Sequence, residues 1–250
     1  ATSDIRTQQL GVSLEAWARA RLRDGASDAS LVRELLTARL DYLDRTPEGK
    51  PLPAPGLSPV GFYQANDLKP ETVAAAVGRT FLGLKLECAQ CHDHPFDKWT
   101  QYQAWETAAF FAAVSPMETK VKPQSGLALR RELTINGTTT KAAARFLDGT
   151  VPEWSKTPDP RSVFATWLTA RQNPYFARVM ANHAWASLFG VGLVDPLDDW
   201  GPHNPPSHPE LLDELAVAYA DAGYDPKVLI RAIVASDAYQ RTSRVTHPSQ

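Results

Sequence analysis

The stretch Cys88-Ala89-Gln90-Cys91-His92 dominates this sequence, because it holds the only two cysteines of the 250-residue chain. A histidine follows the second cysteine directly. This Cys-x-x-Cys-His spacing is typical of covalent c-type haem attachment, in which two thiols bond to the vinyl groups at one edge of the porphyrin. The adjacent histidine then binds the iron as the proximal ligand. The motif therefore predicts one covalent haem c, held by Cys88, Cys91 and His92.

Three other interpretations of the motif stay open at the level of the sequence. A disulfide between Cys88 and Cys91 would close a very small loop, which stabilises little and is strained on a helix. A thioredoxin-like redox pair expects a βαβ context, whereas the residues before the motif have a helical pattern. A zinc ion could bind Cys88, Cys91 and His94, but other side chains would have to complete its tetrahedral set. Haem attachment is the favoured interpretation.

The overall charge and hydropathy exclude several classes of protein. The formal net charge is −2, with acidic and basic residues interspersed, which argues against nucleic acid or an anionic membrane surface as the main partner. No apolar run approaches the ~20 residues of a membrane span. No basic-then-apolar leader stands at Ala1. Because haem is attached outside the cytoplasm in bacteria, we expect a periplasmic or otherwise exported chain whose signal peptide is not in this sequence.

Helical periodicity covers most of the chain. The most important predicted helix begins at about Lys69, with Asp67 as its cap and Pro70 in its first turn. Its apolar stripe continues into the motif, so a helix that persists to Pro95 would place Cys88, Cys91 and His92 on one face. Other helices are predicted over residues 3–23, 28–43, 101–114, 161–170, 174–189, 207–222 and 225–238.

One segment has a different character. Residues 127–135 and 138–146 flank Asn136-Gly137, which predicts a β-hairpin around a tight turn. The 20 prolines exceed the 14 glycines, which indicates long ordered loops between the helices. The predicted fold is therefore mainly α, helical bundle-like, with long proline-rich loops and one small β-hairpin insertion.

Longer motifs resemble a known pair of domains. Residues 81–100, which contain the Cys-x-x-Cys-His motif, and the continuation 108–112 are similar to the signature of the planctomycete-type secreted cytochrome domain. The second half resembles that family's C-terminal companion domain in the motifs at residues 167–168, 173–178, 185, 188–194, 198–199, 206–213, 223–225 and 239–240. The resemblance implies a cytochrome-like region 1–116, a hairpin and loop connector 117–157, and a companion domain 158–250.

The resemblance supports haem attachment more than any particular reaction, because the family has little characterised biochemistry. Two features differ from its usual pattern. The N-terminal part is short, so we expect a shortened or processed member, or a subunit of something larger. His183 stands where the family leads us to expect arginine.

The sixth ligand of the iron would decide the chemistry. A methionine or histidine there gives electron transfer, whereas an open position allows peroxide or small-ligand chemistry. Met117 is the first candidate, because it lies in the loop after the predicted helix 101–114, as in small cytochromes whose distal methionine lies downstream. His208, which heads a predicted helix behind a Ser207 capping box, is the second candidate.

These observations predict an exported c-type haem protein that acts in electron transfer with a redox partner protein or as a subunit of a larger complex, and that is not itself an enzyme. One alternative is a structural or interaction subunit in which haem, a disulfide or a metal has a structural role. A second alternative is an exported hydrolase-like enzyme that uses the loop 195–208. The acids and histidines of that loop could bind a divalent ion, although such acids also cap helices and turns: Asp195, Asp198, Asp199, His203 and His208.

Overall fold

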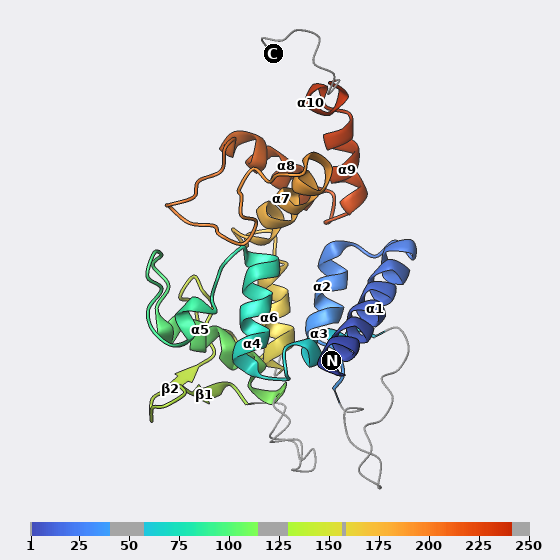
Figure 1. Ribbon diagram of the computed structural model, residues 1–250. Helices are drawn as coiled ribbons and strands as arrows, with labels where there is room; N and C mark the ends of the chain where they lie inside the picture. The colour runs from blue at the N-terminus through green and yellow to red at the C-terminus, as the bar shows by residue number, and fades with distance from the viewer. Residues whose placement is uncertain (1, 41–57, 115–129, 157–158, 242–250) are drawn as a thin grey trace.

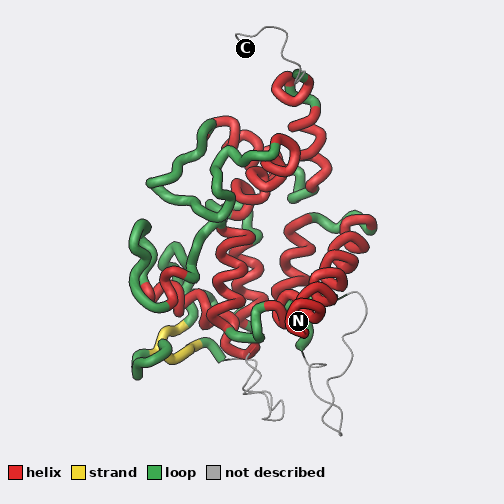
Figure 2. Tube along the Cα trace, in the orientation of Figure 1, coloured by secondary structure: helices red, strands yellow, loops and turns green. Residues whose placement is uncertain are grey.

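A computed structural model describes residues 2–40, 58–114, 130–156 and 159–241 of the chain. Within them the fold is mainly helical with one antiparallel hairpin, which confirms the predicted fold class (Figures 1 and 2). The α-helices are α1 (Thr2–Arg23), α2 (Asp28–Leu36), α3 (Val60–Ala65), α4 (Pro70–Val77), α5 (Gln101–Ala108), α6 (Pro160–Leu168), α7 (Phe176–Phe189), α8 (Pro209–Asp221), α9 (Pro226–Val234) and α10 (Asp237–Gln240). The strands are β1 (Glu132–Thr134) and β2 (Lys141–Ala143).

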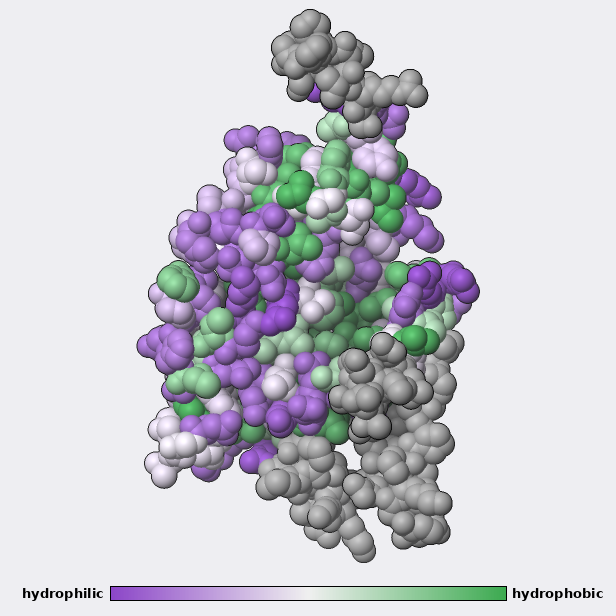
Figure 3. Space-filling model, in the orientation of Figure 1, coloured by the Kyte–Doolittle hydropathy of each residue, from purple (hydrophilic) through white to green (hydrophobic). Residues whose placement is uncertain are grey.

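The helices pack in small groups around a shared apolar core. Helix α1 contacts α2 and α3, α2 contacts α6, and α4 contacts α5. The helices α7, α8 and α9 contact one another and form the upper part of Figure 1. One cluster of buried apolar side chains extends from Trp17 on α1 to Ile233 on α9. On the surface in Figure 3, hydrophilic residues dominate, and hydrophobic residues gather over the upper helices.

Local signals in the sequence account for several helix ends. Thr100 caps α5 in a complete capping box with Gln103. Asp159 accepts a hydrogen bond from the backbone N–H of Arg161 at the start of α6. Gly190 ends α7 in the left-handed conformation, with φ 81°. These ends depend on short-range contacts, and for this reason a sequence pattern can locate them.

The predicted helix from Lys69 to Pro95 is wrong in its second half. Helix α4 continues as a π-helical turn, Gly78–Leu82, and then stops at Gly83, whose φ is 69°. A Cβ atom at Gly83 would lie 2.2 Å from Cδ1 of Trp200, so the indole occupies the space beside this glycine. The backbone N–H of Trp200 also donates to the Gly83 carbonyl at 3.0 Å. A tertiary contact with the second half of the chain therefore ends the helix ahead of the motif.

Four further expectations need correction. Asp67 does not cap α4, because its own φ is 55° and Lys69 is the N-cap residue. His208, not Ser207, is the N-cap of α8, and no side-chain hydrogen bond caps that helix, so the predicted Ser207 capping box is wrong. The helix predicted over residues 225–238 is in fact two helices, because α9 ends at Val234 and Ser236 caps a separate helix, α10. Helix α2 ends at Leu36, earlier than predicted.

The hairpin is shorter than predicted but has the expected turn. Strands β1 and β2 pair with Glu132 opposite Ala143 and Thr134 opposite Lys141. The connecting loop closes through two backbone bonds, from Ile135 N–H to the Thr140 carbonyl and from Thr138 N–H to the Ile135 carbonyl. Gly137 takes a φ of 75° in this turn, which glycine adopts readily.

Replacing Gly83 by alanine tests the contact that ends α4. The left-handed backbone costs a residue with a Cβ about 1–2 kcal/mol, and overpacking against Trp200 adds about 1–3 kcal/mol, so we expect a loss of about 2–5 kcal/mol. Gly137→Ala is the matched control, because Gly137 has a similar φ but a Cβ added there would meet no atom within 4 Å. Urea denaturation should show only the ~1–2 kcal/mol backbone cost for the control. Equal losses in the two variants would contradict the account.

Candidate functional site

The Cys-x-x-Cys-His motif forms an exposed turn rather than part of a helix. Residues Cys88–Gln90 make one 3-10 turn, and Cys91 follows with φ −106° and ψ −26°. Both thiols are free and exposed, and the His92 ring is exposed beside them. Ala89 points the other way and is fully buried in the apolar core. The turn therefore presents its three reactive side chains to the surface on a backbone that is fixed from beneath.

Gln90 provides most of that fixation. Its side-chain amide donates to the Glu71 carbonyl at 3.0 Å, at the start of α4. Its own backbone carbonyl accepts from Trp105 Nε1 at 3.0 Å and from Gln101 Nε2 at 3.1 Å, both on α5. The motif is thus bonded to two helices through a residue that the Cys-x-x-Cys-His pattern leaves unspecified.

The residues after His92 turn back on the same helix. Asp93 Oδ1 accepts from the backbone N–H of Gln101 at 2.8 Å, at the start of α5. A backbone bond of 2.7 Å from His94 N–H to the Trp99 carbonyl closes the following loop. Trp99 is buried, with 3% of its surface exposed. The loop 94–99 is therefore anchored at both ends.

The hydrogen bonds of the two histidines distinguish their roles. His92 Nδ1 lies 2.7 Å from the Asp93 carbonyl oxygen, which can only accept, so in neutral His92 the proton is on Nδ1 and Nε2 has a free lone pair. His94 Nδ1 accepts from the backbone N–H of Phe96 at 3.3 Å, so in neutral His94 the proton is on Nε2. A metal-binding histidine usually donates its second ring N–H to an oxygen. His92 has that arrangement and His94 does not.

The residues around the motif suit the edge of a haem that is bonded to the cysteines better than they suit the flat apolar face of the porphyrin. A hollow of about 380 Å³ adjoins Cys91, and most of the other residues that line it are polar: Lys69, Glu71, Thr72, Gln90, Gln101, Trp105 and Asn136. These residues would lie beside the edge of the porphyrin that carries the thioether bonds, not beside its carboxylate groups. Apolar surface is offered by Phe96, whose side chain is 79% exposed. The two thiols and His92 fit covalent attachment, and the described residues supply only part of an apolar wall.

The structure describes only one of the two candidates for the sixth ligand. Met117 lies outside the described residues. His208 stands exposed at the start of α8, where its Nδ1 lies 3.2 Å from Ser207 Oγ. In the part of the chain that the structure describes, no hydrogen bond or ion pair joins His208 to the motif. The distal side thus remains a prediction.

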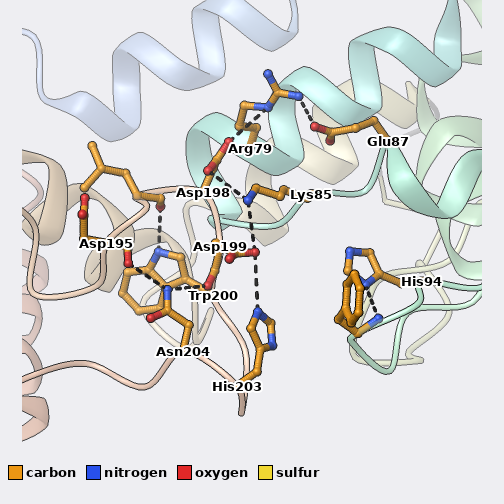
Figure 4. Close-up of polar contacts among 12 residues, drawn as sticks. Arg79, Lys85, Glu87, His94, Asp195, Asp198, Asp199, Trp200, His203 and Asn204 are labelled. Carbon is orange, nitrogen blue, oxygen red and sulfur yellow. Dashed lines mark hydrogen bonds and ion pairs between the residues drawn. The ribbon is translucent and has the colours of Figure 1, made fainter.

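The loop 195–208 forms an ion-pair network rather than a cluster of free acids (Figure 4). Lys85 Nζ lies 3.2 Å from Asp199 Oδ1 and 3.8 Å from Asp198 Oδ1. Arg79 Nε lies 3.4 Å from Asp198 Oδ2, and the same guanidinium pairs with Glu87. The network joins the second half of the chain to the residues that flank Gly83.

His203 completes the network. Its Nε2 lies 3.5 Å from Asp199 Oδ1. Partial burial raises the pKa of Asp199, but Lys85 and then His203 lower that pKa by more, so it lies below its ordinary value. The Asp199 carboxylate is therefore held as an ion, chiefly by Lys85 of the first half of the chain. Asp195 is not one of the acids in these ion pairs. Its backbone carbonyl accepts a hydrogen bond from Asn204 Nδ2 at 3.2 Å.

The described residues contain no group of three or more His, Cys, Asp or Glu side chains placed to hold a metal ion. Nor does any helix of this part of the chain combine the length and apolar character needed to cross a membrane.

Sequence reasoning missed three residues that shape the site. Gln90 and Trp105 bond to each other across 15 positions, and Trp200 packs on Gly83 from much farther along the chain. Only Trp105 had a usable signal, since a buried indole N–H needs an acceptor. The partners themselves could not be identified without the fold.

Two family models match this chain. Residues 14–116 match PSCyt2, described as a protein of unknown function (DUF1549), and residues 160–250 match PSD1, described as a protein of unknown function (DUF1553). The matches support the pair of domains that the sequence resemblance indicates. Comparison with curated proteins and with solved structures finds no match.

The acid sensitivity of the network can be tested with Asp199→Asn. Because the pKa of Asp199 is lowered in the folded chain, its ion pairs stabilise the protein above the unfolded pKa of about 4, and this stabilisation is lost as the pH falls through the folded value. We expect wild type to exceed the variant by about 0.2–1 kcal/mol near neutral pH and by less below pH ~4, measured by urea unfolding. Asp24→Asn, at an exposed site on the end of α1, is the control. A wild-type advantage that does not change with pH would exclude this role for Asp199.

Proposed function

We propose that this chain, which pairs a region similar to PSCyt2 with a region similar to PSD1, is an exported electron-transfer protein that carries one covalent haem c. Cys88 and Cys91 would form the two thioether bonds, and His92 would bind the iron. The observation that carries this proposal is the motif turn, in which both thiols are exposed and His92 Nε2 is free while Nδ1 faces a carbonyl oxygen.

The haem, when bound, supplies a one-electron redox centre whose potential depends on its axial ligands and surroundings. The residues of this chain do the rest. Gln90 and Asp93 hold the turn on α4 and α5, so attachment requires no rearrangement of the core. Lys69 and Gln101 line the hollow beside Cys91, at the edge of the haem that would carry the thioether bonds. Arg79 and Lys85 already pair with acids, so they are not free to hold the propionate groups.

Electron transfer also requires a partner that approaches the haem. An exposed motif turn favours close approach, and exposed Phe96, four residues after His92, offers apolar surface for such a contact. We therefore include in the proposal a redox partner protein or a larger complex, outside the cytoplasm, where covalent haem attachment takes place.

Two other functions are weaker. A structural or interaction subunit would use the same motif with haem, a disulfide or a metal in a structural role, and only a redox measurement separates it from an electron carrier. A hydrolase built on the loop 195–208 is disfavoured, because Asp198 and Asp199 are engaged by Arg79 and Lys85.

Haem attachment is tested by producing the chain in cells that attach c-type haem and measuring the pyridine haemochrome spectrum. We expect wild type to give the spectrum of a haem with two thioether bonds, and the double variant Cys88→Ala/Cys91→Ala to retain no covalent haem. In the visible spectrum of the folded protein without pyridine, His92→Ala should show the loss of the proximal ligand, whereas His94→Ala is the matched control and should keep a wild-type spectrum. Wild type without covalent haem after native maturation would refute the proposal. Reversible redox cycling of the haem then distinguishes electron transfer from a structural role.

The distal ligand is tested separately with the two methionines of the chain. If Met117 binds the iron, Met117→Ala should abolish the weak red absorption band of a methionine-ligated ferric haem and lower the reduction potential, because a thioether ligand favours the reduced iron. Met180→Leu, on α7, is the control and should leave both unchanged. If Met117→Ala has no effect but His208→Ala changes the spectrum, the second candidate is the ligand.

A further inference from the structure

A second hollow, of about 270 Å³, lies where the loop after the motif meets the second half of the chain. Its walls come from Leu84 and from three segments: the loop residues 97–99, residues 174–178 around the start of α7, and the loop residues 200–206. Neither the haem proposal nor the ion-pair network uses these surfaces. The hollow therefore needs an explanation of its own.

The walls of this hollow are held in place by the surrounding structure. The backbone N–H of Trp200 donates to the Gly83 carbonyl at 3.0 Å, and its indole Nε1 donates to the Leu197 carbonyl at 2.9 Å. Pro174, Pro202 and Pro206 line the rim, and proline has a fixed φ. A binding site of this kind is largely pre-formed, so a ligand would lose little free energy to ordering it.

Flat aromatic surfaces form part of the lining. The rings of Tyr175 and Trp200 are partly exposed there, and Trp99 contributes a buried wall. The Trp99 indole N–H is buried and has no hydrogen-bond partner among the described residues. Aromatic faces next to a few polar groups are typical of sites that bind a small ring-shaped molecule.

The polar groups of the hollow can both donate and accept. Burial raises the pKa of Tyr175, and the charges of Asp148 and Asp97 raise that pKa further, so the phenol is protonated at neutral pH. No hydrogen bond of the Tyr175 hydroxyl is found within the described residues, so this group is available to a ligand. The Asp97 carboxylate adds acceptors, and the Lys98 ammonium adds donors.

The charges of these groups largely cancel. Asp97 and Lys98 are adjacent in sequence, and the Lys98 backbone N–H donates to Asp97 Oδ1 at 2.7 Å. Arg178 also lines the hollow, but its Nε lies 2.8 Å from Asp213 Oδ1. Neither a strongly anionic nor a strongly cationic ligand is therefore favoured.

We infer that this hollow binds a neutral ring that carries hydroxyl groups, with the ring against Tyr175 and Trp200 and its hydroxyls on the Tyr175 hydroxyl, Asp97 and Lys98. A sugar and a phenol share this chemistry. The inference goes beyond the proposed electron transfer and does not depend on the presence of haem.

The test is a titration of the full chain by saturation-transfer NMR and calorimetry. One arm uses neutral sugars (glucose, galactose and their β-linked disaccharides), the other uses hydroquinone and catechol, and benzoate serves as a charged probe. We expect one arm to bind at millimolar concentration, and Tyr175→Phe and Asp97→Asn each to weaken that binding by about 2- to 10-fold, the value of one hydrogen bond.

Tyr102→Phe is the matched control, because the Tyr102 hydroxyl bonds to the Lys141 carbonyl at 3.3 Å, away from the hollow. It should leave the affinity unchanged. The inference is overturned if neither arm binds, if benzoate binds as tightly as the neutral probes, or if Tyr175→Phe and Asp97→Asn bind like wild type. Each outcome is read on binding alone, so it is independent of the haem assay.

Discussion

The contact between the Gly83 backbone and the Trp200 indole is the constraint on which the site depends. Only a residue without a Cβ fits beside Trp200, and only the left-handed backbone of Gly83 ends α4 at this point. The chain then leaves the helix and forms the exposed turn instead of continuing as a helix through both cysteines. Ion pairs from Arg79 and Lys85 to the loop 195–208 act on the same junction, so the second half of the chain positions the motif of the first.

In the motif turn, the residues that anchor the backbone are different from the residues that lie exposed at the surface. Ala89 is buried and Gln90 bonds to α4 and α5, whereas Cys88, Cys91 and His92 lie at the surface. A group attached to the thiols would therefore sit on the protein and not inside its core. Residues 97–99 of the loop that follows the motif line the second hollow, so one segment connects the proposed haem site to the proposed ligand site.

The parts of the fold that follow from short-range chemistry could be predicted from the sequence. Thr100 caps α5, Gly190 ends α7 and Asn136-Gly137 forms the hairpin turn, because each depends on residues a few positions away. The end of α4 could not be predicted, since an amphipathic stripe continues past Gly83 and the deciding indole is far along the chain. The Cys-x-x-Cys-His motif predicts Cys88, Cys91 and His92 as the site residues, but its pattern says nothing of Gln90. For the loop 195–208, the composition suggested a metal or hydrolase site. In the folded chain, its residues Asp198 and Asp199 instead form ion pairs with Arg79 and Lys85.

The central claim is that Cys88 and Cys91 carry a covalent haem, and peptide mass spectrometry of the natively matured protein tests it most directly. Trypsin cleavage after Lys85 and Lys98 gives a peptide, 86–98, that contains both cysteines and His92. The account predicts that this peptide carries the mass of one haem and that neither thiol reacts with an alkylating reagent. A peptide of unmodified mass with two alkylated thiols, or with a disulfide between them, would contradict it.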